Sequence, residues 1–516
     1  MRKRSLLTQL MTRSVQAALM LTLVIRNDTY ATLSDDVGGP FDLLDSSVSS
    51  IPPEILHTYE EYLSHVRKNK PDKAIESAAR MRDQFADVYG ENSPVMHAPT
   101  TFLGMVQIDN EKTSDGLVTL QRSVNLIEAV YGNFAFRMVA PLRAIAVAHE
   151  RLGDRASAVN NLQRAQHLTH RQGGVYAEDQ LPIVDQLITL QEQARNTTLV
   201  DTLASFYLRV HEDLYGEDDP RVVPALLRSA RLMTDRGTAT PGLRMRQPTT
   251  RLQPAEEDDS PKLRLTRNGF VVDRKPGAAK TPQTAAQQVR RPPTSPLKRT
   301  RYFNTAYKYY DRAIRIIEDS YGGDNLRLVA PLRGLARAKF QRAFGGPVPT
   351  HALGLKGAST DAMRRIANIV SEHPASDVRD IANSIVDLAD LYTIWNDSRA
   401  DAAYKEAWDA IPGEPRYDML RAELFGEPTL IYPRRIGNRL KERYWNRDRD
   451  NYVELGYIVR ANGRARRFET LESTVGARAR HRLQSKLTRA RFRPRVVNGE
   501  VVRTEGLVFK HKYEVY

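Results

Sequence analysis

The chain has 516 residues, no cysteine and a formal net charge of +15. From Ile431 to Tyr516 there are 22 Lys and Arg residues against 9 Asp and Glu, so a surplus of 13 positive charges lies in this last part. The absence of cysteine excludes disulfides, thiol catalysis and cysteine-ligated zinc or iron–sulfur sites. The length exceeds one ordinary hydrophobic core, so we expect several domains or a repeat array.

Residues 1–31 have the order of a secretory signal peptide, with a basic start, an apolar run from Val15 to Ile25 and a small residue at Ala31. We therefore predict export to the periplasm. An uncleaved membrane anchor is an alternative, because Leu6 to Ile25 has about the 20 residues that span a bilayer. A short amphipathic helix of a cytoplasmic protein is another. Residues 32–51 are rich in Asp, Gly and Ser and predict a linker.

A repeated stretch dominates the middle of the chain. YGNFAFRMVAPLR at Tyr131–Arg143 returns as YGGDNLRLVAPLR at Tyr321–Arg333, with looser copies from Tyr89 and Tyr215. The prolines at positions 99, 141, 182, 224 and 331 are separated by 42, 41, 42 and 107 residues. Such a fixed period indicates stacked supersecondary units, and the last gap indicates an insertion.

Each unit is expected to contain two helices. In the third unit Leu142, Ile145, Ala146 and His149 share one face of the first helix, and Ala158, Leu162 and Ala165 share a face of the second. The expected pairs span 52–90, 94–132, 137–174, 178–215, 220–320, 325–373 and 376–411. The sixth pair is expected to have a long turn, from Phe344 to Ser359.

This pattern resembles the tetratricopeptide repeat (TPR), in the longer form found in kinesin light chains. The resemblance implies a TPR-like α-solenoid over residues 52–412, whose concave groove binds protein segments.

The fifth pair is predicted to be interrupted by a disordered insertion at 237–300. Nine prolines and few aromatic residues occur there, so the segment cannot bury much apolar surface. Phe270–Val272 is its one candidate for folding on contact with a partner. A tolerated surface insertion is the simpler interpretation, because a longer loop costs little closure entropy.

After Pro412-Gly413 the helical period stops, and residues 413–450 are expected to form a connector. Tyr452 to Val459 alternates as a strand, an Asn-Gly turn follows, and Arg464 to Leu471 predicts a second strand. Thr474 to Arg491 predicts a helix and Leu507 to Tyr516 a last strand. The order is β-β-α-β, so the fold class is mainly α with a small α+β domain at 451–516.

This order, with Arg491-Phe492-Arg493-Pro494 and the turn at Asn498-Gly499, resembles the carboxyl-terminal domain of TonB-type energy transducers. In that family the last strand is a sheet edge that captures an extended peptide by strand addition. The resemblance implies a partner-binding edge here. Its residues are Gly506, Leu507, Val508, Phe509, Lys510, His511, Lys512 and Tyr513.

Other patterns predict no chemistry. The arginines of the last helix (Arg478, Arg480, Arg482, Arg489, Arg491) are either a grip for an anionic envelope component or a solvated basic face. We do not expect nucleic acid as a partner, because the chain is predicted to be exported and has no aromatic–basic interleaving. His167 and His170 lie one turn apart without a suitable carboxylate, so core or surface histidines are the simpler interpretation.

We find no nucleophile motif, phosphate loop or carboxylate pair. We therefore predict a non-catalytic periplasmic scaffold without a cofactor. An inner-membrane-anchored, TonB-like energy transducer is the alternative, and an enzyme or substrate-presenting subunit is the third hypothesis.

Overall fold

The computed structural model describes residues 51–239, 263–266, 269–272, 296–344, 352–433, 439–440 and 450–515, together with Leu33 and residues 40, 41, 43 and 44. The predicted signal peptide at 1–31 lies outside the described residues, as does most of the predicted linker. The chain divides into two compact units, Met1–Glu217 and Asp218–Tyr516.

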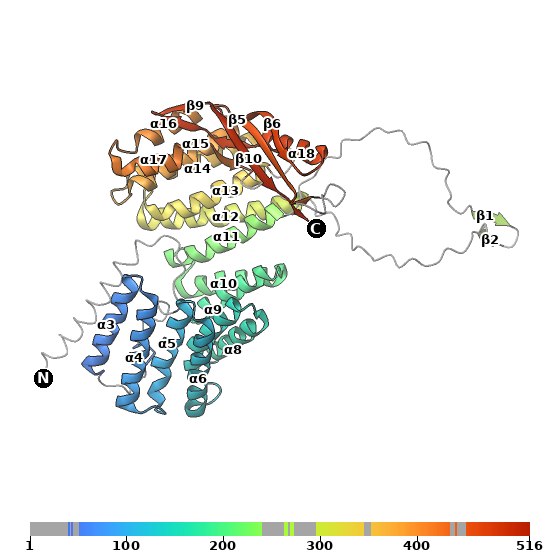
Figure 1. Cartoon of the computed structure of the whole chain (residues 1–516). Coiled ribbons are helices and arrows are strands. Elements are labelled where there is room, and N and C mark those ends of the chain that lie inside the picture. Colours follow the sequence, from blue (N-terminus) through green and yellow to red (C-terminus); the bar gives the residue numbers. More distant parts are fainter. Residues whose placement is uncertain are drawn as a thin grey trace. The chain divides into compact units, whose positions relative to one another are not determined.

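Within its described residues, the first unit contains four successive helix pairs (Figure 1). These are α3 (Pro53–Arg67) with α4 (Pro71–Tyr89), α5 (His97–Asp109) with α6 (Thr113–Tyr131), α7 (Val139–Arg151) with α8 (Arg155–Gly173), and α9 (Gln180–Gln193) with α10 (Thr197–Tyr215). The 3-10 turns η1 (Pro94–Met96) and η2 (Phe136–Met138) lead into α5 and α7. Each helix packs on the next one in the chain, and α5 also contacts α7.

The predicted apolar faces form the core of this unit. Leu142, Ile145 and Ala146 of α7 are buried, and so are Ala158, Leu162 and Ala165 of α8. Small residues set the distance within a pair, because a Cβ on Gly116 of α6 would lie 2.7 Å from the carbonyl oxygen of Gly104 on α5. Leu33, within the predicted linker, is also buried in this core.

The second unit begins with three more pairs. These are α11 (Val223–Ala239) with α12 (Pro296–Tyr321), α13 (Val329–Phe344) with α14 (Ala352–Glu372), and α15 (Val378–Trp395) with α16 (Ala400–Asp409). The turns η3 (Pro220–Val222) and η4 (Leu326–Leu328) precede α11 and α13, so the repeated YG segment builds the same kind of turn before α13 as before α7. The predicted fold class, a mainly α TPR-like array followed by a small α+β region, is confirmed.

Two details of the array differ from the prediction. The turn expected at 344–359 is shorter, since α14 already begins at Ala352. The glycines of this stretch, Gly354 and Gly357, suggest a turn by their type, but they lie within the helix. Inside the predicted insertion, Leu263–Thr266 (β1) and Gly269–Val272 (β2) pair as an antiparallel hairpin. In the backbone register of this hairpin, Leu263 is opposite Val272 and Leu265 is opposite Phe270.

After α16 the chain builds a mixed α+β region (Figure 1). Its helices are α17 (Asp418–Phe425), preceded by η5 (Pro415–Tyr417), and α18 (Ala477–Arg489). Its strands are β3 (Thr429–Tyr432), β4 (Arg439–Leu440), β5 (Tyr452–Val459), β6 (Ala465–Ser473), β7 (Arg491–Arg493), β8 (Arg495–Val497), β9 (Glu500–Val502), β10 (Thr504–Lys512) and β11 (Glu514–Val515).

The expected connector at 413–450 therefore contains α17 and β3, and the β-β-α-β order omits several short strands. Helix α17 forms because Leu420, Leu424 and Phe425 bury one side of it. Strand β3 pairs with β7, more than fifty residues later in the chain. The helix predicted to reach Arg491 ends at Arg489, because β7 already begins at Arg491.

Candidate partner-binding edge of the carboxyl-terminal sheet

Strand β10 lies at one edge of a three-stranded antiparallel sheet. The order is β10–β5–β6, so among the described strands β10 pairs with β5 alone in this sheet. Gly506 has φ +68°, and the register shifts between Thr504 and Leu507. From Leu507 to Lys512 the ladder is continuous, opposite Tyr457 to Tyr452. The continuous edge is thus six residues long.

The inner face of β10 is part of the sheet's core. Leu507, Phe509 and Tyr513 are half-buried and pack against the cluster that contains Leu483 of α18 and Phe492 of β7. The His511 ring is buried between its neighbours, with its centroid 4.6 Å from that of Tyr513. These contacts fix the strand from one side, so its backbone edge is held in a defined position.

The outer face of β10 carries the apolar residue Val508, followed by Lys510 and Lys512. Val508 is 54% exposed and lies opposite Gly456 of β5. On the other side of Gly456 lies Leu471 of β6, which is 50% exposed and would lie 3.5 Å from a Cβ at Gly456. The two side chains flank the glycine, which leaves a shallow apolar patch across the sheet.

Charged side chains border this patch. Lys510 Nζ lies 3.3 Å from a carboxylate oxygen of Glu454 and 4.6 Å from the centre of the Tyr452 ring. The Tyr452 hydroxyl donates a hydrogen bond to Glu472, and this bond raises the pKa of Tyr452. Lys512 pairs with Asp450 at 3.8 Å. These exposed pairs are individually weak, so a partner's charges can replace them.

A buried ion pair joins β7, which pairs with β3, to the last helix pair. Arg493 of β7 donates two hydrogen bonds to Asp390 of α15, at 3.0 and 2.7 Å, and both side chains are less than 15% exposed. The Tyr404 hydroxyl of α16 donates to the same carboxylate at 2.8 Å. Burial raises the pKa of Tyr404 well above its usual value, and the charge of Asp390 adds to the effect. Strand β7, whose Phe492 lies in the core cluster of the three-stranded sheet, is therefore fixed to the last helix pair.

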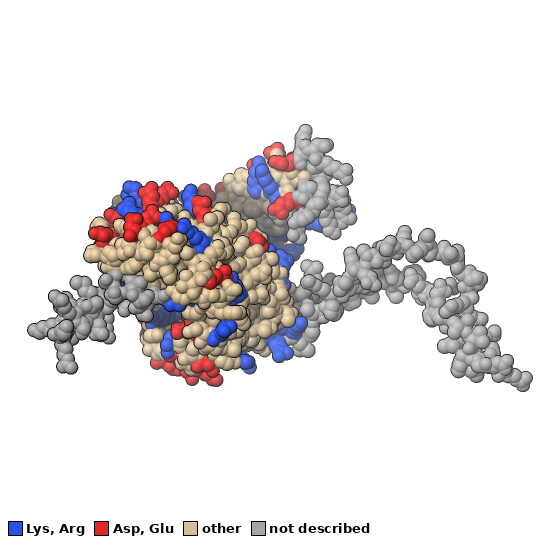
Figure 2. All heavy atoms as spheres, turned by 90° about the horizontal axis from the view of Figure 1, so that it is seen from below, with Lys and Arg blue, Asp and Glu red and all other residues tan. Residues whose placement is uncertain are grey.

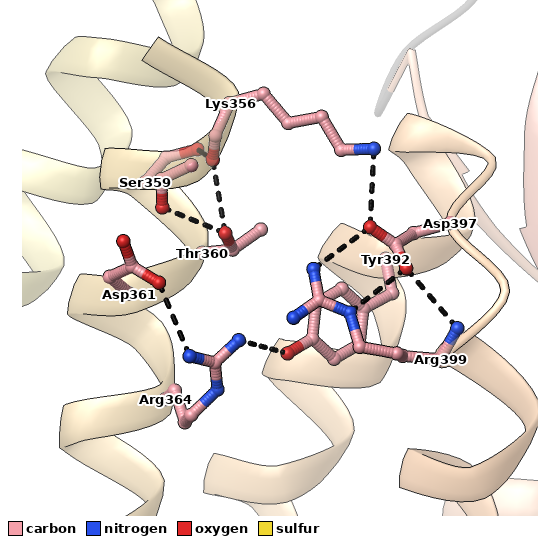
Figure 3. A network of polar contacts seen from close by, with 9 residues as sticks. Lys356, Ser359, Thr360, Asp361, Arg364, Tyr392, Asp397 and Arg399 are labelled. Atoms are coloured by element: carbon pink, nitrogen blue, oxygen red, sulfur yellow. Dashed lines mark hydrogen bonds and ion pairs between the residues drawn. The ribbon is translucent and has the colours of Figure 1, made fainter. Parts of the chain in front are cut away.

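The turn between α15 and α16 carries a second polar network (Figure 3). Asp397 is 11% exposed and accepts from both Nε and Nη2 of Arg399, at 3.0 Å each, and from Lys356 Nζ of α14 at 3.1 Å. The hydrogen bond from Arg399 is the largest cause that holds the pKa of Asp397 well below its usual range, and Lys356 lowers it further. Arg399 also lies over the Tyr392 ring, whose hydroxyl accepts from Arg364. The network connects α14, α15 and the turn, so its role is structural. We call this set of contacts around Asp397 the joint.

In the second unit, a row of ion pairs joins the first helix of each helix pair, namely α11, α13 and α15. Arg337 of α13 pairs with Asp235 of α11 at 3.2 Å, and Arg333 pairs with Asp387 of α15 at 3.6 Å. Each of these four side chains is about half exposed. On the molecular face that Figure 2 shows, acidic and basic side chains are likewise interspersed. A segment with mixed charge would find partners of both signs along this row.

The predicted site residues fall into three groups in the structure. Gly506 forms the bulge, Tyr513 follows the strand, and the six residues between them form the ladder. Along β10 the exposed residues Val508, Lys510 and Lys512 alternate with Leu507 and Phe509, which are half-buried. Capture of a partner by this edge stays a prediction.

Sequence reasoning missed the residues that support the site. Asp390 and Arg493 are 103 positions apart, and no local pattern links them. A signal was present for Asp397, because Asp-x-Arg also occurs at Asp219–Arg221, where the same carboxylate–guanidinium contact forms. There it lowers the pKa of Asp219 to about 2.

The described residues show neither a metal cluster nor a membrane span. No group of three or more His, Asp and Glu side chains among them is placed to hold a metal ion. In the same residues, no helix combines the length and the apolar character needed to cross a bilayer.

The two histidines that lie one turn apart, His167 and His170, influence each other. Burial lowers the pKa of His170, and the charge of His167 lowers it further.

No family model matches the chain, and no curated protein matches it either. Solved structures with TPR-like repeats are similar at low identity. The TPR-like repeats of a kinesin light chain from Podosopora anserina are 13% identical, with a TM-score of 0.33 over 37% of this chain and 90% of that one.

Two further structures match over longer stretches. BtubC (BKLC) from P. vanneervenii is 11% identical, with a TM-score of 0.37 over 62% of this chain and 95% of that one. The quorum sensor NprR from B. thuringiensis is 11% identical, with a TM-score of 0.30 over 74% of this chain and 100% of that one. At such values, the fold assignment rests on the helix pairs of this chain itself.

Proposed function

We propose that this protein is a non-catalytic scaffold of the cell envelope that holds segments of other proteins. One surface is the edge of β10, which takes up an extended peptide as an additional strand. The other is the exposed side of α11, α13 and α15, where the row of ion pairs offers charges of both signs.

The edge position of β10 is the observation that carries this proposal. The strand has six continuous residues, a half-buried inner face and a pairing partner on one side only among the described strands of its sheet. An open ladder of this kind supplies backbone donors and acceptors to a bound strand. Val508 would give that strand an apolar contact, because its side chain stands free beside Gly456.

The periplasmic location and the likeness to TonB-type domains belong to this proposal. Both rest on sequence patterns, and the signal-like stretch lies outside the described residues. Sequencing the amino terminus of the purified protein tests the location. A mature start near Thr32 supports a released periplasmic scaffold, whereas an intact amino terminus in the membrane fraction supports the anchored transducer instead.

A photo-crosslinking amino acid at Val508 tests the edge directly. We expect discrete adducts with envelope proteins in the native cell, since this side chain would lie within the interface. Met419 of α17 is the matched control, because it is an apolar residue that is 84% exposed and lies outside the sheet. Equal adduct patterns from the two positions would show that exposure alone drives the reaction.

Proline at both Val508 and Lys510 gives the complementary test. Proline cannot donate to a ladder, so partner capture should be lost while far-UV circular dichroism keeps its helical signal. A double variant that still holds its partners as well as the wild type would refute strand addition.

A further inference from the structure

Three arginines converge near the start of β6, the edge strand opposite β10 in the three-stranded sheet. Arg464 precedes β6, Arg466 lies in β6, and Arg491 begins β7 directly after α18. All three are half-buried. They come from segments that the fold brings together, so the cluster is a product of tertiary structure and differs from the row of arginines on α18.

None of the three forms an ion pair with a described Asp or Glu. Arg464 donates to the side-chain oxygen of Asn396 at 2.8 Å, and Arg466 donates to the carbonyl oxygens of Ala465 and Thr488 at 3.0 and 3.4 Å. Arg491 donates to the carbonyl oxygens of Arg489 and Ala490. Several of these acceptors lie at the end of α18, where the helix dipole favours cations. They are neutral, however, so three positive charges share one place without a negative charge.

Two N–H donors of the cluster have no hydrogen-bond acceptor. The Nε atoms of Arg464 and Arg491 are buried and have no hydrogen-bond partner. Buried donors in proteins are nearly always satisfied, by the chain or by something bound to it. Burial lowers the pKa of Arg491, and the charges of Arg464 and Arg466 lower it further, as expected for like charges held close together.

A cavity of about 270 Å³ adjoins the cluster between β6 and α18. Its lining includes Phe468, His481, Thr488 and Arg489. Two of the lining residues hold guanidinium groups of the cluster, because the backbone carbonyl of Thr488 accepts from Arg466 and that of Arg489 accepts from Arg491. Phe468 gives the cavity an apolar wall next to a cationic one.

We propose that Arg464, Arg466 and Arg491 bind a phosphate-type oxyanion, with the adjoining cavity taking the organic group attached to it. Guanidinium groups match the tetrahedral oxyanion because their paired N–H donors fit two oxygens at once. The anion neutralises the three positive charges of the cluster. Its source is either a soluble phosphate ester or the headgroup of a phospholipid.

The test uses the full chain and two probes. Inorganic phosphate is titrated calorimetrically, with acetate at equal ionic strength as the control for general charge effects. Sedimentation with vesicles of phosphatidylglycerol and phosphatidylcholine, against phosphatidylcholine alone, probes the lipid source. The variant is Arg466→Gln, and Arg478→Gln is the matched control because it removes the same charge from an exposed position of α18.

We expect Arg466→Gln to weaken binding by roughly tenfold or more, because hydrogen bonds to a charged ligand are lost, and Arg478→Gln to change it little. Phosphate binding that is weakened by Arg466→Gln and not by Arg478→Gln supports a soluble ester. Vesicle binding that is weakened in the same way, without phosphate binding, supports a phospholipid headgroup.

Equal responses of the two variants, or no binding in either arm, would overturn the proposal and leave the arginines as caps of α18. If Arg466→Gln loses its circular dichroism signal, Arg466→Lys replaces it, because lysine keeps the charge and removes the planar donors. We expect the binding affinity of Arg466→Lys to lie between that of the wild type and that of a complete loss. The result is independent of the β10 edge, because Val508 adducts should persist in Arg466→Gln.

Discussion

In the helical array one contact recurs, whereas in the carboxyl-terminal region each contact occurs once. Arg137 lies over the Tyr131 ring at 4.4 Å before α7, and Arg327 lies over the Tyr321 ring at 4.1 Å before α13. The attachment of β7 to α15 instead relies on the single pair Arg493–Asp390, to which Tyr404 adds one hydrogen bond. A repeat array spreads its stability over many similar interfaces, whereas this attachment has one such ion pair.

The largest effect is expected from breaking the single pair. Asp390→Ala leaves the Arg493 guanidinium buried without its counter-charge, which should cost about 3–5 kcal/mol in the free energy of unfolding. Urea unfolding followed by tryptophan fluorescence reports on this region, because Trp395 and Trp408 lie in α15 and α16. The double variant Asp390→Leu/Arg493→Met should recover part of the loss. If the double variant is as unstable as the single one, the isolated charge is not the cause.

A smaller effect is expected from crowding one contact between repeat helices. A Cβ at Gly334 of α13 would lie 2.3 Å from the Tyr310 ring of α12, so Gly334→Ala should cost about 1–3 kcal/mol through overpacking. Gly357 of α14 is the matched control, since a Cβ there meets no atom within 4 Å. Gly357→Ala should stabilise by about 0.4–1 kcal/mol, as the unfolded chain loses entropy. Similar changes in melting temperature at both positions would contradict close packing at Gly334.

The smallest effect is expected at the joint of Asp397, and it depends on pH. The folded-state pKa of Asp397 is depressed, so its contribution to stability is present above the unfolded value of about 3.9 and is lost as the pH falls toward the folded value. Asp397→Asn should therefore lower the melting temperature at neutral pH and lower it less below about pH 4. A difference between variant and wild type that stays constant from pH 7 to pH 3 would show that the charge of Asp397 is not what stabilises the joint.

The sequence by itself determined the features that repeat or alternate. The YG segments before α7 and α13 build like turns because the same residues make the same local contacts, and a fixed period needs no distant partner. The faces of β10 follow from strict alternation between Leu507 and Lys512, and the Asn498-Gly499 turn follows from two residues that tolerate positive φ.

Only the tertiary structure decided the features that join distant segments. Arg493 meets Asp390 across 103 positions, β3 pairs with β7, and Arg464, Arg466 and Arg491 converge although they belong to different elements. Hydrophobic periodicity places a side chain on a face, but it does not say which other element that face meets. Such contacts form only when packing has fixed the elements relative to one another, and the candidate anion site is one of them.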